Sequence, residues 1–235
     1  MSTLTVFVQS KIRSPSTSPL SPATFKQWYE QIHIPDLLAL PEITSAGRFV
    51  KSDIVTPDDE LAAAGFPYLA VYPGLSREWL KDERCGFLKV PLHSEILPGE
   101  KGFVFDVADF EMGGYEVLGR VKRRAGEGRG MVVVPVEGEV VEGKGWETVV
   151  GESRGMLELG EGEGESVVMR YDFSPTGMGP REKEVGEGVL FVGGRYLVLH
   201  QLESLPPKEV PEQWGKKPVV YSLIRAFGES EGPLI

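Results

Sequence analysis

Three histidines carry the most direct chemistry in this sequence: His33, His93 and His200. An imidazole side chain titrates near neutral pH, so each of them could transfer a proton without help from a cofactor. His33 lies two residues before Pro35, on a segment with the apolar spacing of an amphipathic helix. A proline break leaves helical carbonyl groups without partners, so His33 is expected either to act in catalysis or to hydrogen-bond those carbonyls.

His93 occupies the sequence VPLHSEILPG, where Ser94 and Glu95 follow it. This triplet does not predict a catalytic triad, because neighbours along a loop or strand point apart and no GxSxG motif is present. His93 is therefore a candidate to line a pocket, and the alternative is that it only shapes the loop.

Alternating tyrosines accompany the third histidine. His200 alternates with Tyr196 on one predicted strand, and Tyr68 alternates with Tyr72 on another. If these faces look into a barrel, the hydroxyl groups and the imidazole meet there, and Tyr72 joins the histidines as a candidate catalytic residue. The alternative is an aromatic core whose polar tips are satisfied by hydrogen bonds.

Arg48 is the candidate for binding a charged group of a ligand. It lies in the strand-like sequence ITSAGRFV, and a buried guanidinium group could hold a carboxylate or a phenolate. The alternative is an ion pair with an internal acid, for which Asp36 and Asp109 are the candidates. The residues predicted to contact a substrate are Trp28, Tyr29, Tyr68, Arg48 and Tyr196.

The composition argues against several other functions. The net charge of −10 disfavours nonspecific binding to nucleic acid or to anionic membranes. The single cysteine, Cys85, favours a reducing compartment, and without a CxxC or His–Cys cluster a zinc site is not expected. No apolar run approaches the roughly 20 residues that a membrane helix needs. The sequence therefore predicts a soluble, cytoplasmic protein that needs no metal and no cofactor.

The first half of the chain contains the elements that would position these residues. Strand-like patterns cover residues 4–11, 43–50, 67–72 and 103–123, and a second helical pattern covers 75–88. The first helix is predicted to begin after the N-cap Ser21, to break or kink after His33, to resume at Asp36 and to end at Pro41. The order β-α-β-β-α-β is that of a ferredoxin-like unit.

The first helix also carries a family resemblance. The segment WYEQIHIPDLL, followed by a proline and a strand that ends in Arg-aromatic, resembles the fungal EthD-like proteins of the dimeric α+β barrel superfamily. The matching residues are Trp28, Tyr29, Glu30, His33, Pro35, Asp36, Leu37 and Leu38, and the segments 67–72 and 90–99 also fit the group. The resemblance implies ferredoxin-like units that pair into a barrel. It also implies a role for His33, because related EthD-type decarboxylases and cyclases use a pocket histidine.

The second half resembles a degenerate repeat of the first. Strand-like patterns cover residues 129–138, 165–175, 195–204 and 218–229. The aligned pairs are Arg48 with Arg170, Tyr68 with Tyr196, and Tyr72 with His200. Residues 138–165 are rich in glycine and glutamate, which predicts an exposed, mobile loop in place of the first helix, with a short helical piece around 146–150. A lid over a cavity is the functional alternative for this loop.

A tandem repeat defines the expected fold class and oligomeric state. Residues 1–112 and 113–235 are predicted to be two ferredoxin-like repeats that form one α+β barrel within the chain, a pseudo-dimer. Such a barrel leaves no open sheet edge. The chain is therefore expected to be a monomer with an internal pseudo-dimer, and a homodimer is the alternative.

These observations lead to a hypothesis about function. We expect a cofactor-independent enzyme of secondary metabolism that acts on a hydrophobic, oxygenated small molecule such as a polyketide, by cyclisation, isomerisation, dehydration or decarboxylation. In this hypothesis His33 is the acid or base, and Tyr72, His93 or His200 polarises a carbonyl or phenol group. One alternative is a cofactor-free monooxygenase on the same fold. Another is a non-catalytic small-molecule-binding or stress-related protein.

Overall fold

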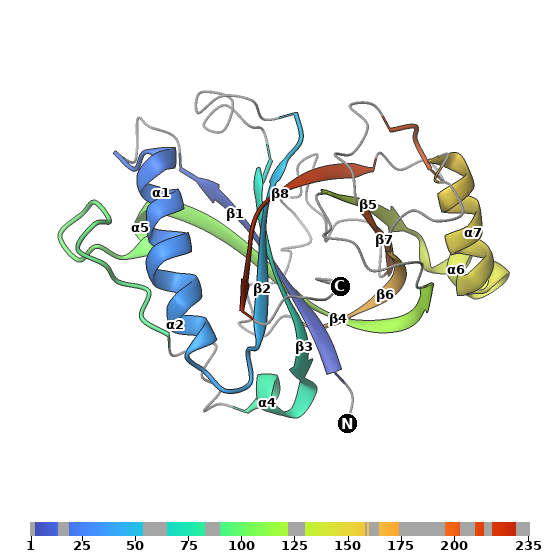
Figure 1. The fold of residues 1–235 in the computed structure, drawn as a ribbon, viewed down its shortest axis with the longest axis horizontal. Coiled ribbons are helices and arrows are strands. Elements are labelled where there is room, and N and C mark those ends of the chain that lie inside the picture. Colours follow the sequence, from blue (N-terminus) through green and yellow to red (C-terminus); the bar gives the residue numbers. More distant parts are fainter. Residues whose placement is uncertain are drawn as a thin grey trace.

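A closed antiparallel barrel of eight strands is the centre of the computed structural model (Figure 1). The structure describes residues 3–13, 19–53, 65–82, 90–121, 130–157, 159, 165–173, 196–202, 210–213 and 218–228. The strands in these residues are β1 (Thr3–Ile12), β2 (Ser45–Lys51), β3 (Tyr68–Ser76), β4 (Ala108–Val121), β5 (Gly130–Val136), β6 (Glu165–Phe173), β7 (Tyr196–Leu202) and β8 (Val219–Gly228). The eight strands predicted from the sequence are therefore present, with their ends shifted.

The order of neighbouring strands is the same in both halves of the chain. The first four strands lie side by side as β4-β1-β3-β2 and the last four as β8-β5-β7-β6, so each half has the order fourth, first, third, second. Two further pairings, β2 with β8 and β4 with β6, join the halves and close the ring. Strand β4 runs continuously through residue 112, where the sequence predicts the boundary between the halves.

The strand register limits how the two halves can be aligned. Arg48 lies opposite Ala70, whereas Arg170 lies opposite Tyr196. Tyr68 stands two residues before Ala70 on the same strand. The expected matches of Arg48 with Arg170 and of Tyr68 with Tyr196 therefore cannot both hold, because they differ by two residues in register.

The first helix runs without interruption from residue 22 to residue 38 (Figure 1). It consists of α1 (Pro22–Trp28), the π-helical turn η1 (Tyr29–His33) and α2 (Ile34–Leu38). As predicted, Ser21 caps the helix, and its hydroxyl oxygen accepts a hydrogen bond from the backbone N–H of Thr24 at 3.1 Å.

The sequence predicts a break or a kink of this helix after His33, and the break is not found, because a π-helical turn carries the helix through this point. The backbone N–H of Ile34 donates to the carbonyl of Tyr29, five residues earlier, which is the hydrogen bond of a π-helix. Pro35 then stands in the first turn of α2, where a missing N–H group is tolerated. The wider turn therefore accommodates the proline without ending the helix.

The prediction of a loop at residues 138–165 is also wrong for most of that segment. Two helices, α6 (Gly138–Lys144) and α7 (Trp146–Met156), occupy it and meet at Gly145, whose φ angle is 79°. Their apolar side chains, including Val149 and Val150, are buried against the sheet. Packing of an apolar face stabilises these helices more than their glycines weaken them.

Two shorter helices lie between β3 and β4 in the first half. Helix α4 (Arg77–Lys81) begins at its N-cap Ser76, whose hydroxyl accepts a hydrogen bond from the backbone N–H of Trp79 at 3.3 Å. The rest of the predicted helix, residues 83–88, lies outside the described residues. Helix α5 (Val104–Val107) replaces the start of the strand predicted from residue 103. None of the helices that the structure describes is both long and apolar enough to cross a membrane.

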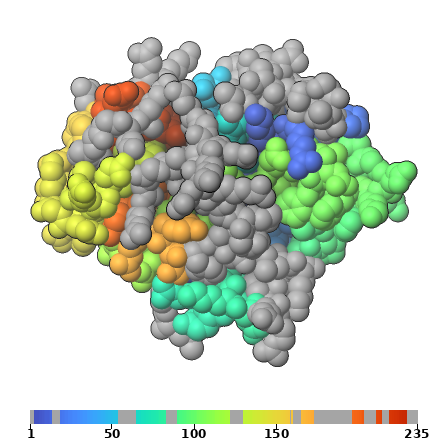
Figure 2. All heavy atoms as spheres, turned by 180° about the vertical axis from the view of Figure 1, so that it is seen from behind, coloured from blue at the N-terminus to red at the C-terminus, as the bar shows by residue number. Residues whose placement is uncertain are grey.

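Three apolar cores follow from this architecture. The barrel interior takes side chains from all eight strands, among them Phe7, Phe49 and Tyr115. The first layer lies between helix 22–38 and the outer face of β1, β2 and β3. The second layer lies between α6–α7 and the outer face of β5, β6 and β7. Figure 2 shows the molecule from behind, with α6 and α7 (yellow) at one side and residues 90–121 (green) at the other.

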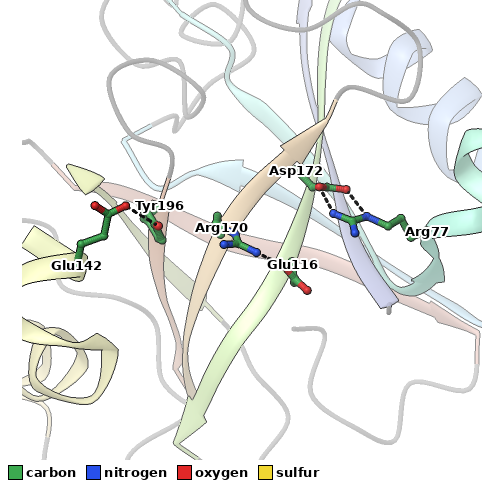
Figure 3. A network of polar contacts seen from close by, with 6 residues as sticks. All are labelled: Arg77, Glu116, Glu142, Arg170, Asp172 and Tyr196. Carbon is green, nitrogen blue, oxygen red and sulfur yellow. Dashed lines mark hydrogen bonds and ion pairs between the residues drawn. The ribbon is translucent and has the colours of Figure 1, made fainter. Parts of the chain in front are cut away.

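Ion pairs line the joint between β4 and β6 (Figure 3). Arg170 donates to Glu116 at 2.6 Å across the two strands. Arg77, at the start of α4, binds both carboxylate oxygens of Asp172, with Nε at 2.7 Å from Oδ2. The Arg77–Asp172 pair therefore ties the first half of the chain to the second.

Candidate functional site around Arg48

The structure divides the predicted site residues among three places. Most of them meet in the first layer, together with Glu30. We call this group the Arg48 cluster; its members are Trp28, Tyr29, Glu30, His33, Arg48, Tyr68 and Tyr72. His200 and Tyr196 lie in the second layer, and His93 lies in the segment between residues 90 and 103.

Arg48 is held by aromatic rings. Its guanidinium carbon lies 4.0 Å from the ring centroid of Tyr29, 4.9 Å from that of Tyr68 and 5.4 Å from that of Phe25. The side chain is fully buried, with an exposed fraction of 0%. Strand alternation explains its direction, because the next residue, Phe49, points into the barrel and Arg48 points into the first layer.

The hydrogen-bonding capacity of this arginine is unused within the described residues. None of its three guanidinium nitrogens has a hydrogen-bond partner there. Trp28 Nε1, His33 Nδ1 and Glu30 Oε1 are likewise buried without a hydrogen-bond partner in the part of the chain that the structure describes. Since most buried polar groups in proteins are hydrogen-bonded, a concentration of such atoms in one place points to a ligand site.

The predicted pairing of Arg48 with an internal acid is confirmed, but neither of the two acids suggested for it is the partner. Asp109 pairs with Arg13 at 2.9 Å, and the carboxylate near Arg48 is Glu30 rather than Asp36. Glu30 Oε1 lies 3.8 Å from Arg48 Nε, which is within range of an ion pair but too long for a hydrogen bond. Glu30 therefore balances the charge of Arg48 and leaves its N–H groups available.

Glu30 is the site residue that sequence reasoning missed. In a regular α-helix Glu30 and Trp28 would lie about 200° apart around the axis, so both could not face the sheet. In the structure both are buried, because the π-helical turn widens the helix from Tyr29 onward. The sequence WYEQIHIP contains the residue, but its apolar spacing does not reveal the turn that directs it inward.

His33 stacks on Trp28, with ring centroids 4.7 Å apart and an interplanar angle of 13°. It also meets the ring of Tyr29 edge-on at 5.2 Å. Burial lowers the pKa of His33 to about 3, and the positive charge of Arg48 adds to this effect. The imidazole is therefore neutral near pH 7, and its Nδ1 atom is unpartnered among the described residues.

Two tyrosine hydroxyls complete the cluster. Burial raises the pKa of Tyr29, and Arg48 and a hydrogen bond with Tyr72 offset part of that increase. Burial also raises the pKa of Tyr72 well above its usual value, with a further contribution from Tyr29. Both hydroxyls are therefore protonated at neutral pH and can serve as hydrogen-bond donors.

The expected meeting of Tyr72 and His200 inside the barrel is wrong. Tyr72 points outward into the first layer and His200 points outward into the second. The residues between them in space belong to the barrel interior, which holds apolar side chains such as Val71 and Leu199. The strand alternation was predicted correctly, but the face that looks inward is the opposite one.

His200 belongs to a buried polar network. Its Nε2 atom lies 2.7 Å from the hydroxyl oxygen of Ser153, and its Nδ1 atom lies 2.8 Å from that of Ser166. Ser153 donates to Gln213 Oε1 at 2.6 Å, and Arg154 donates to Ser166 at 2.8 Å. Since the only proton of Ser153 goes to Gln213, Nε2 of His200 carries the ring proton, and Ser153 is not activated as a nucleophile.

The other two predicted residues also have local partners. Tyr196 donates its hydroxyl proton to Glu142 at 3.3 Å (Figure 3). His93 stacks on Phe103 at 4.6 Å, and its Nδ1 atom lies 3.0 Å from the backbone carbonyl of Lys101. Neither residue is part of the Arg48 cluster. Among the described residues there is also no group of three or more His, Cys, Asp or Glu placed to hold a metal ion.

Comparison with known proteins supports the fold. No family model matches the sequence, and no curated protein matches it. A solved structure described as an anthrone oxidase-like protein matches with a TM-score of 0.51 and 14% identity, over 98% of this chain and 95% of that one. A structure from Fusobacterium nucleatum subsp. nucleatum, described as a candidate monooxygenase, has a TM-score of 0.48 and 8% identity, over 97% and 95%. The chain thus has a closed antiparallel barrel whose fold is similar to that of the structure described as anthrone oxidase-like.

Proposed function

We propose that this protein is a cofactor-independent enzyme that acts on a hydrophobic, oxygenated small molecule at the Arg48 cluster. One observation carries the proposal. A fully buried guanidinium group with no hydrogen-bond partner among the described residues lies beside a neutral imidazole and aromatic rings. Aromatic walls with a few convergent polar groups are typical of small-molecule sites.

The proposed chemistry is proton transfer. The ligand oxygen accepts hydrogen bonds from Arg48, and Nδ1 of His33 takes a proton from an adjacent O–H or C–H bond. The electron pair of that bond stays on the ligand, and the negative charge collects on the oxygen that faces Arg48. Isomerisation, cyclisation and dehydration each pass through such an enolate or phenolate, whereas decarboxylation reaches the same kind of anion by loss of CO₂ and then takes up a proton.

We also propose that the chain is a tandem pair of ferredoxin-like units related to the EthD-like proteins. The identical strand order of the two halves supports this reading, as does the helix-on-sheet layer in each half. Because β4 extends to Val121, the units are best divided between β4 and β5. The barrel then forms within one chain, as a pseudo-dimer.

A second candidate function is cofactor-free oxygenation of the same anion. It is favoured by the likeness to the structure described as anthrone oxidase-like. In that reaction the carbanion of an anthrone would react with O₂ to give the quinone and one water, so no external reductant is needed. Binding without catalysis is the third candidate, in which the Arg48 cluster would hold its ligand unchanged.

Anthrone is a probe that separates these candidates. Under nitrogen in deuterated buffer, proton transfer by the enzyme should speed exchange of the anthrone methylene protons, which NMR measures. In air, an oxygen electrode would detect oxygenation. We expect His33→Gln to slow the catalysed step at least about a hundredfold.

A second variant, Arg48→Met, tests the role of the arginine, and Arg225→Met is its matched control. Arg225 is the partner of Arg48 across β2 and β8, but it is exposed. Arg48→Met should abolish anthrone turnover and Arg225→Met should preserve it. Equal activity of His33→Gln and the unmodified protein would remove His33 from the mechanism, and equal effects of the two arginine variants would remove the Arg48 site.

A further inference from the structure

The Arg48 cluster is electrically balanced before any ligand enters it. Arg48 carries one positive charge, and His33 is neutral near pH 7. Among the described residues, Glu30 is the only carboxylate that acts on Arg48 electrostatically. Arg48 and Glu30 are both buried, with side-chain exposed fractions of 0% and 8%. A further charge in this layer would be uncompensated, and an uncompensated buried charge is strongly unfavourable.

The unused hydrogen-bonding atoms are of both kinds. Arg48 and Trp28 offer N–H donors, and Glu30 Oε1 offers an acceptor. In its Nε2–H tautomer His33 offers a second acceptor, Nδ1. A carboxylate ligand could satisfy the donors only, and it would place a second negative charge near Glu30. A phenol or enol can accept from Arg48 through its oxygen or a neighbouring carbonyl, and can donate its proton to Glu30 or His33.

We propose that Glu30 is a specificity-determining residue that makes the Arg48 cluster select neutral phenols and enols over carboxylates. The inference rests on the proposed function and narrows it to one substrate class. Glu30 does so because its charge is close enough to neutralise Arg48, yet at 3.8 Å it forms no hydrogen bond that would use up the guanidinium.

Proton transfer inside such a complex keeps the charge constant. When the ligand O–H or C–H bond breaks, its proton moves to His33 Nδ1 and its electrons stay on the ligand oxygen. The resulting imidazolium and enolate, together with the Arg48 and Glu30 pair, still sum to zero. A neutral weak acid therefore passes through the reaction without placing a net charge in the first layer.

Three matched probes test this preference: 2-naphthol, 2-naphthamide and 2-naphthoate. They share one ring system, and at neutral pH only the naphthoate is charged. Calorimetric titration of the unmodified protein should show binding of the naphthol and the amide, and at least about tenfold weaker binding of the naphthoate. If the unmodified protein binds the naphthoate and the amide with equal affinity, the proposal is refuted, and no variant is needed to reach that result.

Glu30→Gln is the decisive variant, because it removes the charge and nearly preserves the shape. The ratio of naphthoate affinity to naphthol affinity should rise at least about tenfold, because only the naphthoate carries the charge that Glu30 repels. A purely structural role of Glu30 would weaken both probes together, and that result would refute the specificity role. Circular dichroism checks that the variant is folded.

The same titrations distinguish this proposal from the proposed function. If naphthol and naphthoate bind equally, and Arg48→Met removes both, the site stands and the charge selection fails. If none of the three probes binds, or binding survives Arg48→Met, the site itself is refuted and the selection with it. If the unmodified protein prefers the neutral probes and Glu30→Gln reverses that preference, the result supports both the site and the charge selection.

Discussion

At the scale of single residues, burial decides what Arg48 and His33 can do. The aromatic rings around Arg48 compensate its charge from their faces without using its N–H groups, which an acid in hydrogen-bond contact would occupy. The positions of Arg48 and His33 on a strand and a helix could be predicted from their residue types and spacing. The long distance to Glu30 could not, because it depends on how one helical turn packs on the sheet.

The buried histidines predict a loss of stability in acid. Burial lowers the pKa of His33 and His200 to about 3 in the folded protein, whereas an unfolded histidine titrates near 6.5. Between these values the unfolded chain binds protons that the folded chain excludes. The stabilisation is therefore complete above about pH 6.5 and is lost as the pH falls, by about 1.4 kcal/mol per pH unit for each histidine.

Urea denaturation across that pH range measures this effect. His200→Gln should have a shallower pH dependence, since one of the two histidines no longer contributes. The variant should also be less stable at neutral pH, by about 1–3 kcal/mol, because Ser153 and Ser166 lose the imidazole between them. A slope that His200→Gln leaves unchanged would show that the buried imidazole does not control acid unfolding.

At the scale of elements, the two helical segments show where sequence patterns succeed and fail. The first helix was predicted from its cap and its apolar spacing, but its π-helical turn was not, because a shift in hydrogen-bond partner leaves no mark on residue spacing. Helices α6 and α7 were predicted as a loop because of their glycines. Burial of Val149 and Val150 against strands distant in the sequence outweighs that local preference.

Two glycines in α7 are positions where substitution by alanine should increase the stability of the protein. Gly151 and Gly155 lie on its exposed side, and a Cβ atom at either would meet nothing within 4 Å. Gly151→Ala and Gly155→Ala should each raise the free energy of unfolding by about 0.5–1 kcal/mol.

Gly119 on β4 is the matched control for these variants. A Cβ atom there would lie 2.3 Å from the ring of Trp146, so Gly119→Ala should destabilise the protein by about 1–3 kcal/mol. Thermal melts compare the three variants. A melting temperature that rises in Gly119→Ala would show that Trp146 does not pack on this strand as described.

At the scale of the whole molecule, the closed barrel could be predicted and its interior could not. Period-two alternation located the strands, and the repeated order of elements suggested that two sheets join. Which face of β3 and β7 looks inward was predicted wrongly, because aromatic and apolar residues alternate on both faces of these strands. Residues such as Tyr72 and Val71 are equally buried, in different cores.

The joint between β4 and β6 yields a prediction about the coupling of the halves. The Arg77 side chain holds the pKa of Asp172 below its usual value, so this pair contributes stability above about pH 4. Because the pair is partly exposed, Asp172→Asn should cost only about 1 kcal/mol or less, and less still in high salt.

The matched control for the joint is Asp109→Asn, which breaks an exposed pair with Arg13 within the first half. It should have no measurable effect on unfolding monitored by tryptophan fluorescence. If Asp172→Asn is as neutral as this control, the ion pair across the joint does not hold the halves together.

The second layer has a consequence for stoichiometry. His200 already has both ring nitrogens engaged by serines, whereas the guanidinium nitrogens of Arg48 and Nε1 of Trp28 have no hydrogen-bond partner among the described residues. Although the chain has two similar helix-on-sheet layers, we therefore expect it to bind one ligand molecule per chain at saturation. New ligand specificity would then evolve only in the first layer, whereas residues of the second layer could change in ways that favour stability.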